Sequence, residues 1–307
     1  MSEIRSGFCQ TDDGHHLFWQ AAGSGPDTLI CCNGVGVSTF FWKYVVQHFS
    51  STHQVVVWDY RGHGRSDRPS DPTGLDLSIP TTARDLGLVM KAVGCDKAVL
   101  FGHSMGCQVA LERTLQAPET VLGLVLMQGS AGRVLETFYD SQYSRGTITA
   151  IARIANRLGD RVNRIARPLV RSPIAWDVTR RIRAVDPFYT SREDFEPYLE
   201  HLADLDLRLF LAMVQEADKH DAFPRLGDIQ APCLVIAAER DDFTPLWLSE
   251  KMARELPNAE LLVLADGSHA ALIEQPETIN HRVDRFFQQR VIWPGSGKQA
   301  PKGWSKR

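Results

Sequence analysis

The sequence contains no long hydrophobic run. No stretch approaches the roughly 20 apolar residues that a membrane-spanning helix needs, and residues 1–5 lack the apolar core of a secretory signal. We therefore expect neither a transmembrane segment nor a secretory signal. An excess of positive charge is also lacking, because 34 Lys and Arg face 37 Asp and Glu and give a net charge of −3. This balance argues against a nucleic-acid partner.

Cysteine is scarce, and the cysteines follow no metal-binding spacing. The chain has six, of which Cys31, Cys32, Cys107 and Cys233 lie in or beside apolar runs. In such places a free thiol behaves as a small hydrophobic group. We expect reduced thiols, no metal site and a cytoplasmic location.

Short apolar runs alternate with segments of helical periodicity along the 307 residues. We expect a hairpin within 7–20 and then strands at 28–32, 54–59, 97–101, 122–127, 231–238 and 260–264. Helices are expected between them, including 246–256 and 276–290. This alternation predicts an α/β fold with a doubly wound, mostly parallel sheet, whose ligand site lies beyond the carboxyl ends of the strands.

One long segment interrupts the alternation. Residues 131–225 show no clear strand and predict several helices, so we interpret them as a helical cap inserted into the sheet domain. The core then comprises residues 1–130 and 226–292. The remaining residues, 293–307, are rich in Gly, Pro and Lys, and we expect a disordered tail.

A glycine-flanked serine stands between a predicted strand and a predicted helix. The apolar run 99–101 leads directly into Gly102-His-Ser-Met-Gly106, and a helical pattern follows. A strand that enters a helix through G-x-S-x-G is a nucleophile elbow. We expect Ser104 to be strained and to project its Oγ above the sheet, close to the positive end of the helix.

A serine nucleophile needs a general base, and the base needs an orienting acid. His269 follows the predicted strand 260–264, which is where the base of this architecture lies in the order Ser, Asp, His. Asp241 and Asp242 both follow the strand 231–238 and could orient it, and Glu239 is a weaker candidate. We expect His103 to be a packing residue of the elbow. Six further histidines are expected in surface-like contexts (His15, His16, His48, His53, His201, His220), and His281 is expected in the last helix.

Four segments in this order resemble the α/β-hydrolase superfamily, in its esterase/lipase-like branch with a helical cap. They are the elbow, the loop-structuring stretch Asp59-Tyr-Arg-Gly-His-Gly-Arg-Ser66, the acid loop and the histidine loop Gly267-Ser-His269 with Glu274-Gln-Pro276. The resemblance covers about 25–290. In the family's acid loop the Asp stands four residues before a Pro, which selects Asp241, four before Pro245.

The resemblance also implies an oxyanion hole. Its two donors would be the backbone N–H groups of Val35 and Met105. The sequence departs from the family at one point, because Asn33-Gly34 stands where the family usually has His-Gly. Main-chain donors tolerate a change of side chain, so we expect the hole to persist and Asn33 to alter how the loop is held.

These residues imply a serine hydrolase that cleaves a small-molecule carboxylic ester through an acyl-enzyme, without metal or cofactor. Three alternatives use the same triad: a C–C bond hydrolase, a lactonase and a perhydrolase. An alternative of another class is a ligand-binding, receptor-like protein with little turnover. An epoxide hydrolase or dehalogenase is disfavoured because its elbow would carry Asp in place of Ser104.

The first part of the predicted cap is strongly basic. Residues 131–185 contain eleven Arg, no Lys and four acidic residues, a net charge of +7 in a chain whose total is −3. Arg153, Arg157, Arg161 and Arg164 fall on one face of a predicted helix. They form either an ordinary solvated face or a contact with an anionic partner, which could be a lipid surface or a substrate that bears carboxylate or phosphate.

Overall fold

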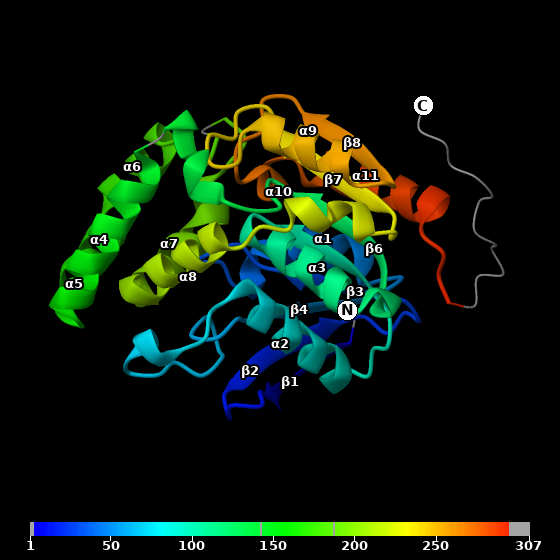
Figure 1. Ribbon diagram of the computed structural model, residues 1–307, viewed down its shortest axis with the longest axis horizontal. Coiled ribbons are helices and arrows are strands. Elements are labelled where there is room, and N and C mark those ends of the chain that lie inside the picture. Colours follow the sequence, from blue (N-terminus) through cyan, green and yellow to red (C-terminus); the bar gives the residue numbers. More distant parts are fainter. Residues whose placement is uncertain (1–2, 142, 187, 295–307) are drawn as a thin grey trace.

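An eight-stranded sheet runs through the computed structural model, which describes residues 3–141, 143–186 and 188–294 (Figure 1). The strand order is β1-β2-β4-β3-β5-β6-β7-β8. The pairs β1/β2 and β2/β4 are antiparallel, and all other neighbours are parallel. The strands are β1 (Ile4–Gln10), β2 (His16–Ala22), β3 (Thr28–Cys32), β4 (Gln54–Trp58), β5 (Ala98–His103), β6 (Val121–Met127), β7 (Cys233–Ala238) and β8 (Ala259–Leu264). The predicted hairpin and mostly parallel sheet are both present.

The central strands are buried on both faces. Every residue of β3, β4, β5 and β7 is buried, which explains why their sequences are continuous apolar runs without alternation. In the parallel pair β3/β5, Cys32 lies opposite Gly102. This register places the loop that follows β3 beside the loop that follows β5, at the edge where a doubly wound sheet binds ligands.

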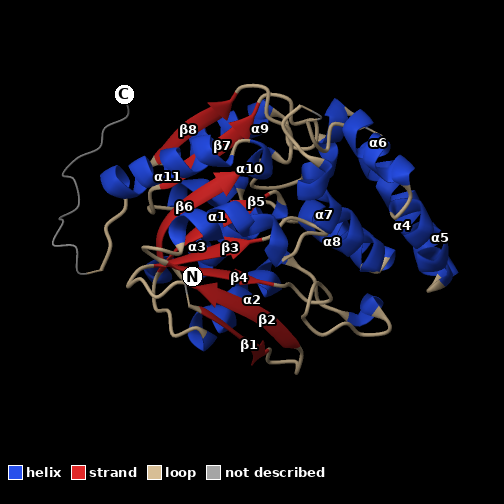
Figure 2. Cartoon of the chain, turned by 180° about the vertical axis from the view of Figure 1, so that it is seen from behind, coloured by secondary structure: helices blue, strands red, loops and turns tan. Residues whose placement is uncertain are grey.

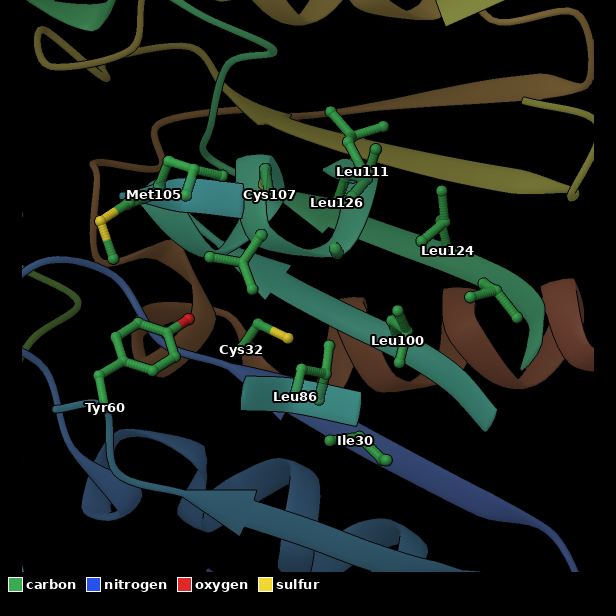
Figure 3. Packing of buried hydrophobic residues seen from close by; sticks show 14 of the residues in the cluster. Ile30, Cys32, Tyr60, Leu86, Leu100, Met105, Cys107, Leu111, Leu124 and Leu126 are labelled. Carbon is green, nitrogen blue, oxygen red and sulfur yellow. The ribbon is translucent and has the colours of Figure 1, made fainter. Parts of the chain in front are cut away.

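Helices cover both faces of the sheet (Figure 2). On one face, α2 (Ile79–Ala92), α3 (Met105–Gln116) and α9 (Leu246–Glu255) pack in one apolar cluster, part of which Figure 3 shows. On the other face, α1 (Lys43–Phe49), α10 (Ala271–Glu274) and α11 (Pro276–Arg290) pack in a second cluster. Short 3₁₀ helices are η1 (Thr39–Trp42), η2 (Pro72–Gly74), η3 (Pro118–Thr120), η4 (Val134–Glu136), η5 (Phe138–Asp140) and η6 (Phe223–Asp228).

The segment between β6 and β7 is helical, as the sequence predicts. It contains α4 (Ser144–Leu158), α5 (Arg161–Val170), α6 (Pro173–Arg181), α7 (Arg192–Asp204) and α8 (Leu207–Lys219). A β-bridge between Gly132 and Asp221 joins its two ends. In Figure 1, α4, α5 and α6 form the outer edge of the molecule, opposite the end of α11. We call residues 131–225 the cap segment.

The C-terminal end of the described chain packs against the core. The ring of Trp293, the first residue of the predicted tail, lies 5.3 Å from the ring of His53 and 5.2 Å from that of Phe287. Residues 295–307 of that predicted tail lie outside the described residues. In the part of the chain that the structure describes, no helix has the length and apolar character needed to cross a membrane.

Candidate active site

The turn at Ser104 is as tight as the elbow pattern predicts. Ser104 joins β5 to α3 with φ 54° and ψ −121°, a conformation that side-chain-bearing residues rarely adopt. A Cβ at Gly102 would lie 2.6 Å from the carbonyl oxygen of Gly106, and one at Gly106 would lie 2.0 Å from that of Cys32. Both positions therefore require glycine, and the strain is held by close backbone packing.

His269 lies against the serine. Its Nε2 is 3.0 Å from Ser104 Oγ, and its Nδ1 is 2.8 Å from Asp241 Oδ2. The histidine comes from the loop after β8 and the aspartate from the loop after β7, so three loops at the carboxyl ends of parallel strands meet here. Only 18% of the His269 side chain is exposed. This arrangement can move a proton from the hydroxyl to Nε2 while a carboxylate faces the other ring nitrogen.

The acid loop distinguishes Asp241 from its neighbours. The Asp241 side chain is fully buried, and its Oδ1 accepts hydrogen bonds from the backbone N–H groups of Phe243 and Thr244, each at 2.9 Å. Its Oδ2 also accepts the Thr244 hydroxyl at 2.7 Å. Asp242 instead faces Arg183 at 3.4 Å, and Glu239 is exposed. Of the three acids considered, only Asp241 contacts His269.

Two backbone N–H groups beside the serine can bind an anion. Within the described part of the chain, no group accepts a hydrogen bond from the N–H of Val35 or of Met105. Met105 is the first residue of α3, where an N–H has no intrahelical partner and the helix dipole favours negative charge. Both residues line the same cavity as Ser104 and His269. These two predicted donors are therefore placed where an oxyanion could be bound.

Asn33 fixes the loop that carries Val35. It is fully buried, and its Nδ2 donates to the carbonyl of Trp58 at 2.7 Å. Its Oδ1 accepts from Trp42 Nε1 at 2.7 Å, and its carbonyl accepts from the Tyr60 hydroxyl at 2.9 Å. The amide side chain is thus satisfied on both sides, so the departure from the usual His leaves the loop anchored to β4 and η1.

Side chains of the stretch from Asp59 to Ser66 hold this loop to neighbouring segments of the core. The Asp59 carboxylate accepts the Ser38 hydroxyl and, at 2.9 Å, the backbone N–H of Arg65. Arg61 makes a bidentate contact with Asp85 on α2, at 2.6 and 2.9 Å, and both side chains are buried. The bidentate geometry supplies the desolvated guanidinium with its counter-charge and fixes the loop to the helix.

Comparison with known proteins identifies the fold family. The family model described as alpha/beta hydrolase fold matches residues 27–276. The chain belongs to this family. It is 28% identical over 270 residues to "Putative carbamate hydrolase RutD" of Azorhizobium caulinodans, with 88% of this chain and 94% of that protein covered.

Solved α/β hydrolases have the same fold. An esterase from Exiguobacterium antarcticum superimposes with a TM-score of 0.71 at 17% identity, covering 92% of this chain and 99% of that one. An enol-lactonase from Burkholderia xenovorans gives a TM-score of 0.73 at 19% identity, covering 92% and 100%. The family match and these names support hydrolase activity on an α/β-hydrolase fold, whereas the bond that is cleaved differs among the named proteins.

Two residues of this α/β-hydrolase hold the histidine loop in ways that the sequence did not reveal. His103, expected only to pack, also donates from Nε2 to the carbonyl of His269 at 2.9 Å, and burial lowers its pKa to about 3. The buried carboxylate of Glu274 accepts the N–H and hydroxyl of Ser268. It also accepts the Asp186 N–H at 2.6 Å and the Thr190 hydroxyl at 2.9 Å, and so connects the histidine loop to the cap segment.

A cavity of about 490 Å³ opens above the serine. The cap segment supplies much of its wall, mostly with aromatic and aliphatic side chains that include Phe138, Tyr143, Ile148 and Phe210. The core adds Phe41 and Phe243, whose ring lies 5.0 Å from that of His269. Among the described residues, no three side chains of His, Cys, Asp or Glu are grouped to hold a metal ion. The cavity suits an apolar ligand of drug-like size.

Proposed function

We propose that this α/β-hydrolase cleaves carboxylic esters with a sizeable apolar acyl or alcohol group through an acyl-enzyme formed on Ser104. The observation that carries the proposal is the continuous contact Asp241–His269–Ser104 at the base of an apolar cavity. Carboxylic ester cleavage, the nucleophile and the acyl-enzyme are all parts of this proposal.

The geometry supports a two-stage reaction. As Ser104 Oγ attacks the ester carbonyl carbon, His269 Nε2 takes the hydroxyl proton, and Asp241 stabilises the imidazolium. The carbonyl oxygen becomes an oxyanion that accepts hydrogen bonds from Val35 and Met105, each such donor being worth about 10²–10³ in rate. The imidazolium then protonates the leaving alkoxide oxygen, and the C–O bond breaks.

The second stage repeats the first with water. His269 removes a proton from water, the resulting hydroxide attacks the acyl carbon, and the oxyanion forms again. Its collapse breaks the bond to Ser104 Oγ, which regains a proton from His269 as the carboxylic acid leaves. All proton transfers pass through the His269 imidazole. Its Nε2 takes and returns the proton, while Asp241 holds Nδ1 and stabilises the imidazolium.

The test is the hydrolysis of p-nitrophenyl esters with acyl chains of increasing length. We expect Ser104→Ala to abolish turnover and labelling by a fluorophosphonate probe. Ser249→Ala is the control, since this buried serine on α9 has no hydrogen-bond partner for its hydroxyl among the described residues and does not line the cavity. Substantial turnover by Ser104→Ala would refute the proposal, and a wild-type chain that neither labels nor turns over would indicate a receptor-like protein.

Carbamate hydrolysis is a second candidate, because the RutD relatives match over 88% of the chain. The same triad could attack a carbamate carbonyl. Carbamate itself is a small polar anion, however, and it would leave most of a 490 Å³ apolar cavity unfilled. We therefore expect kcat/KM for medium-chain esters to exceed that for ammonia release from carbamate, measured above the uncatalysed rate.

A further inference from the structure

Three helices of the cap segment expose apolar side chains. On α4 the exposed residues follow helical spacing and form one stripe, while Ala152 and Ala155 on the adjacent stripe are buried against Leu211 of α8. The exposed stripe is therefore not the face that packs on the core. Aliphatic residues on α5 and α6 are also exposed. The set is Ile151, Ile154, Leu158, Ile165, Leu169, Ile174 and Val178.

Arginines without counter-ions accompany these residues. Six exposed arginines on α4, α5 and α6 form no ion pair with any residue in the described ranges. They are Arg153, Arg157, Arg161, Arg164, Arg167 and Arg181. Other arginines of the cap segment do form ion pairs. We call these arginines and the exposed aliphatic residues the cap surface. It combines open apolar area with uncompensated positive charge.

Two simpler explanations of the cap surface fit the structure less well. None of the described residues that line the reaction cavity is an arginine, so these charges do not bind the substrate in the cavity. A second copy of the chain is also disfavoured as the occupant. Each copy would bring the six unpaired arginines of the cap surface to the interface, and like charges facing each other cost binding energy.

We infer that the cap surface docks on an anionic lipid membrane. The arginines would be drawn to acidic headgroups, while the aliphatic stripes enter the boundary of the acyl chains, as in amphipathic helices that lie in a membrane interface. In Figure 1, α4, α5 and α6 lie together at one outer edge of the molecule.

The cavity entrance lies at the margin of this surface. Tyr143 directly precedes α4 and Ile182 directly follows α6, and both are exposed and line the cavity. Docking would therefore bring the entrance close to the bilayer. Membrane docking itself does not depend on which bond the enzyme cleaves.

Vesicle flotation tests the inference. We expect the full chain to bind vesicles of phosphatidylcholine with 30% phosphatidylglycerol at 50 mM salt. Binding should be weaker at 500 mM salt, because screening weakens the attraction to acidic headgroups. Vesicles of pure phosphatidylcholine should not bind the chain. Arg157→Gln with Arg164→Gln should weaken partitioning about 10- to 30-fold. The control, Arg254→Gln with Arg285→Gln, removes the same charge from exposed sites on α9 and α11 and should change it little.

An apolar pair of variants completes the test. Ile165→Asn should weaken partitioning about tenfold, whereas Ile4→Asn on β1 should not, although the two isoleucines are similarly exposed, at 59% and 64%. Ser104→Ala should bind as the wild type does, which separates docking from catalysis. Absence of binding to the anionic vesicles, equal effects of variants and controls, or a dimer in sedimentation that buries the cap surface would each overturn the inference.

Discussion

Asp241→Asn replaces one buried oxygen by an amide nitrogen and should exchange the donor and acceptor roles of the two ring nitrogens of His269. The Asn oxygen can keep the two backbone N–H bonds that Asp241 Oδ1 accepts from Phe243 and Thr244. The new amide group then occupies the place of Oδ2 and faces His269 Nδ1, 2.8 Å away. An amide N–H donates, so Nδ1 must accept, and the proton of the neutral imidazole moves to Nε2.

The tautomer determines the size of the effect. His269 Nε2 lies 3.0 Å from Ser104 Oγ, and once it carries a proton it cannot accept the hydroxyl proton. The same change in a well-studied serine protease lowers kcat about 10⁴-fold, which corresponds to about 5.5 kcal/mol of activation free energy. We expect a loss of this order for Asp241→Asn, with KM changed much less because the cavity wall is intact.

Asp242→Asn is the matched control. It removes the same charge from the adjacent residue, whose carboxylate faces Arg183 at 3.4 Å in a partly exposed ion pair worth at most about 1 kcal/mol. We expect its kcat to stay within about threefold of the wild type. Initial rates with a p-nitrophenyl ester and the rate of fluorophosphonate labelling measure both variants. If Asp241→Asn kept more than a tenth of the activity, or if Asp242→Asn were the impaired variant, the assignment of the acid would be wrong.

Two further predictions concern the packing around the site. Glu274→Gln replaces an acceptor by a donor opposite the N–H of Ser268, so we expect the free energy of unfolding to fall by about 1–3 kcal/mol. The melting temperature and kcat should both decrease, while Glu255→Gln on α9 leaves both unchanged; an unaltered melting temperature would contradict the bracing role. Burial lowers the pKa of His63 and His201 to about 4 and that of His103 to about 3, below the ordinary value of 6.5. Between pH 6.5 and 4 the unfolded chain therefore binds protons that the native chain does not, and the free energy of unfolding should fall as the pH falls, by up to about 1.4 kcal/mol per pH unit for each histidine. Urea unfolding at several pH values checks this, and His201→Phe should reduce the slope; a stability that rises on acidification would refute it.

Local sequence patterns predicted the parts of the site that are locally determined. The elbow pattern spans five consecutive residues. A Cβ at Gly102 would clash with backbone of the turn itself, at Gly106 and Cys107, whereas a Cβ at Gly106 would clash with the carbonyl of Cys32 on the neighbouring strand. The local pattern did not distinguish Asp241 from Asp242. Both follow β7, and only the resemblance separated them. The structure shows the physical basis, which is the turn that aims two backbone N–H groups at the first carboxylate.

Contacts between distant segments were not predicted. His201 and His220 were expected in surface-like contexts, and this was wrong. The His220 ring is only 8% exposed and lies beside Glu112 at 3.2 Å, and His201 packs near the rings of Phe40 and His63. Both residues belong to helical ends of the cap segment that face the core. Helical periodicity indicates the buried side of a helix but does not identify its tertiary neighbours. For the same reason, the sequence did not predict the hydrogen bonds of Glu274 to residues more than eighty positions away.

In the proposed mechanism, the groups that react and the groups that contact the ligand come from different parts of the fold. The side chains of Ser104, His269 and Asp241 are held at the edge of the sheet, through the register of Cys32 with Gly102 and the short loops after β7 and β8. The cavity wall comes largely from the cap segment, whose helices are fixed by packing and a few ion pairs. Substitutions at wall residues such as Phe138 or Ile148 can therefore alter the ligand without disturbing the hydroxyl, imidazole and carboxylate. This independence explains physically how one fold can serve proteins named for carbamates, esters and enol-lactones.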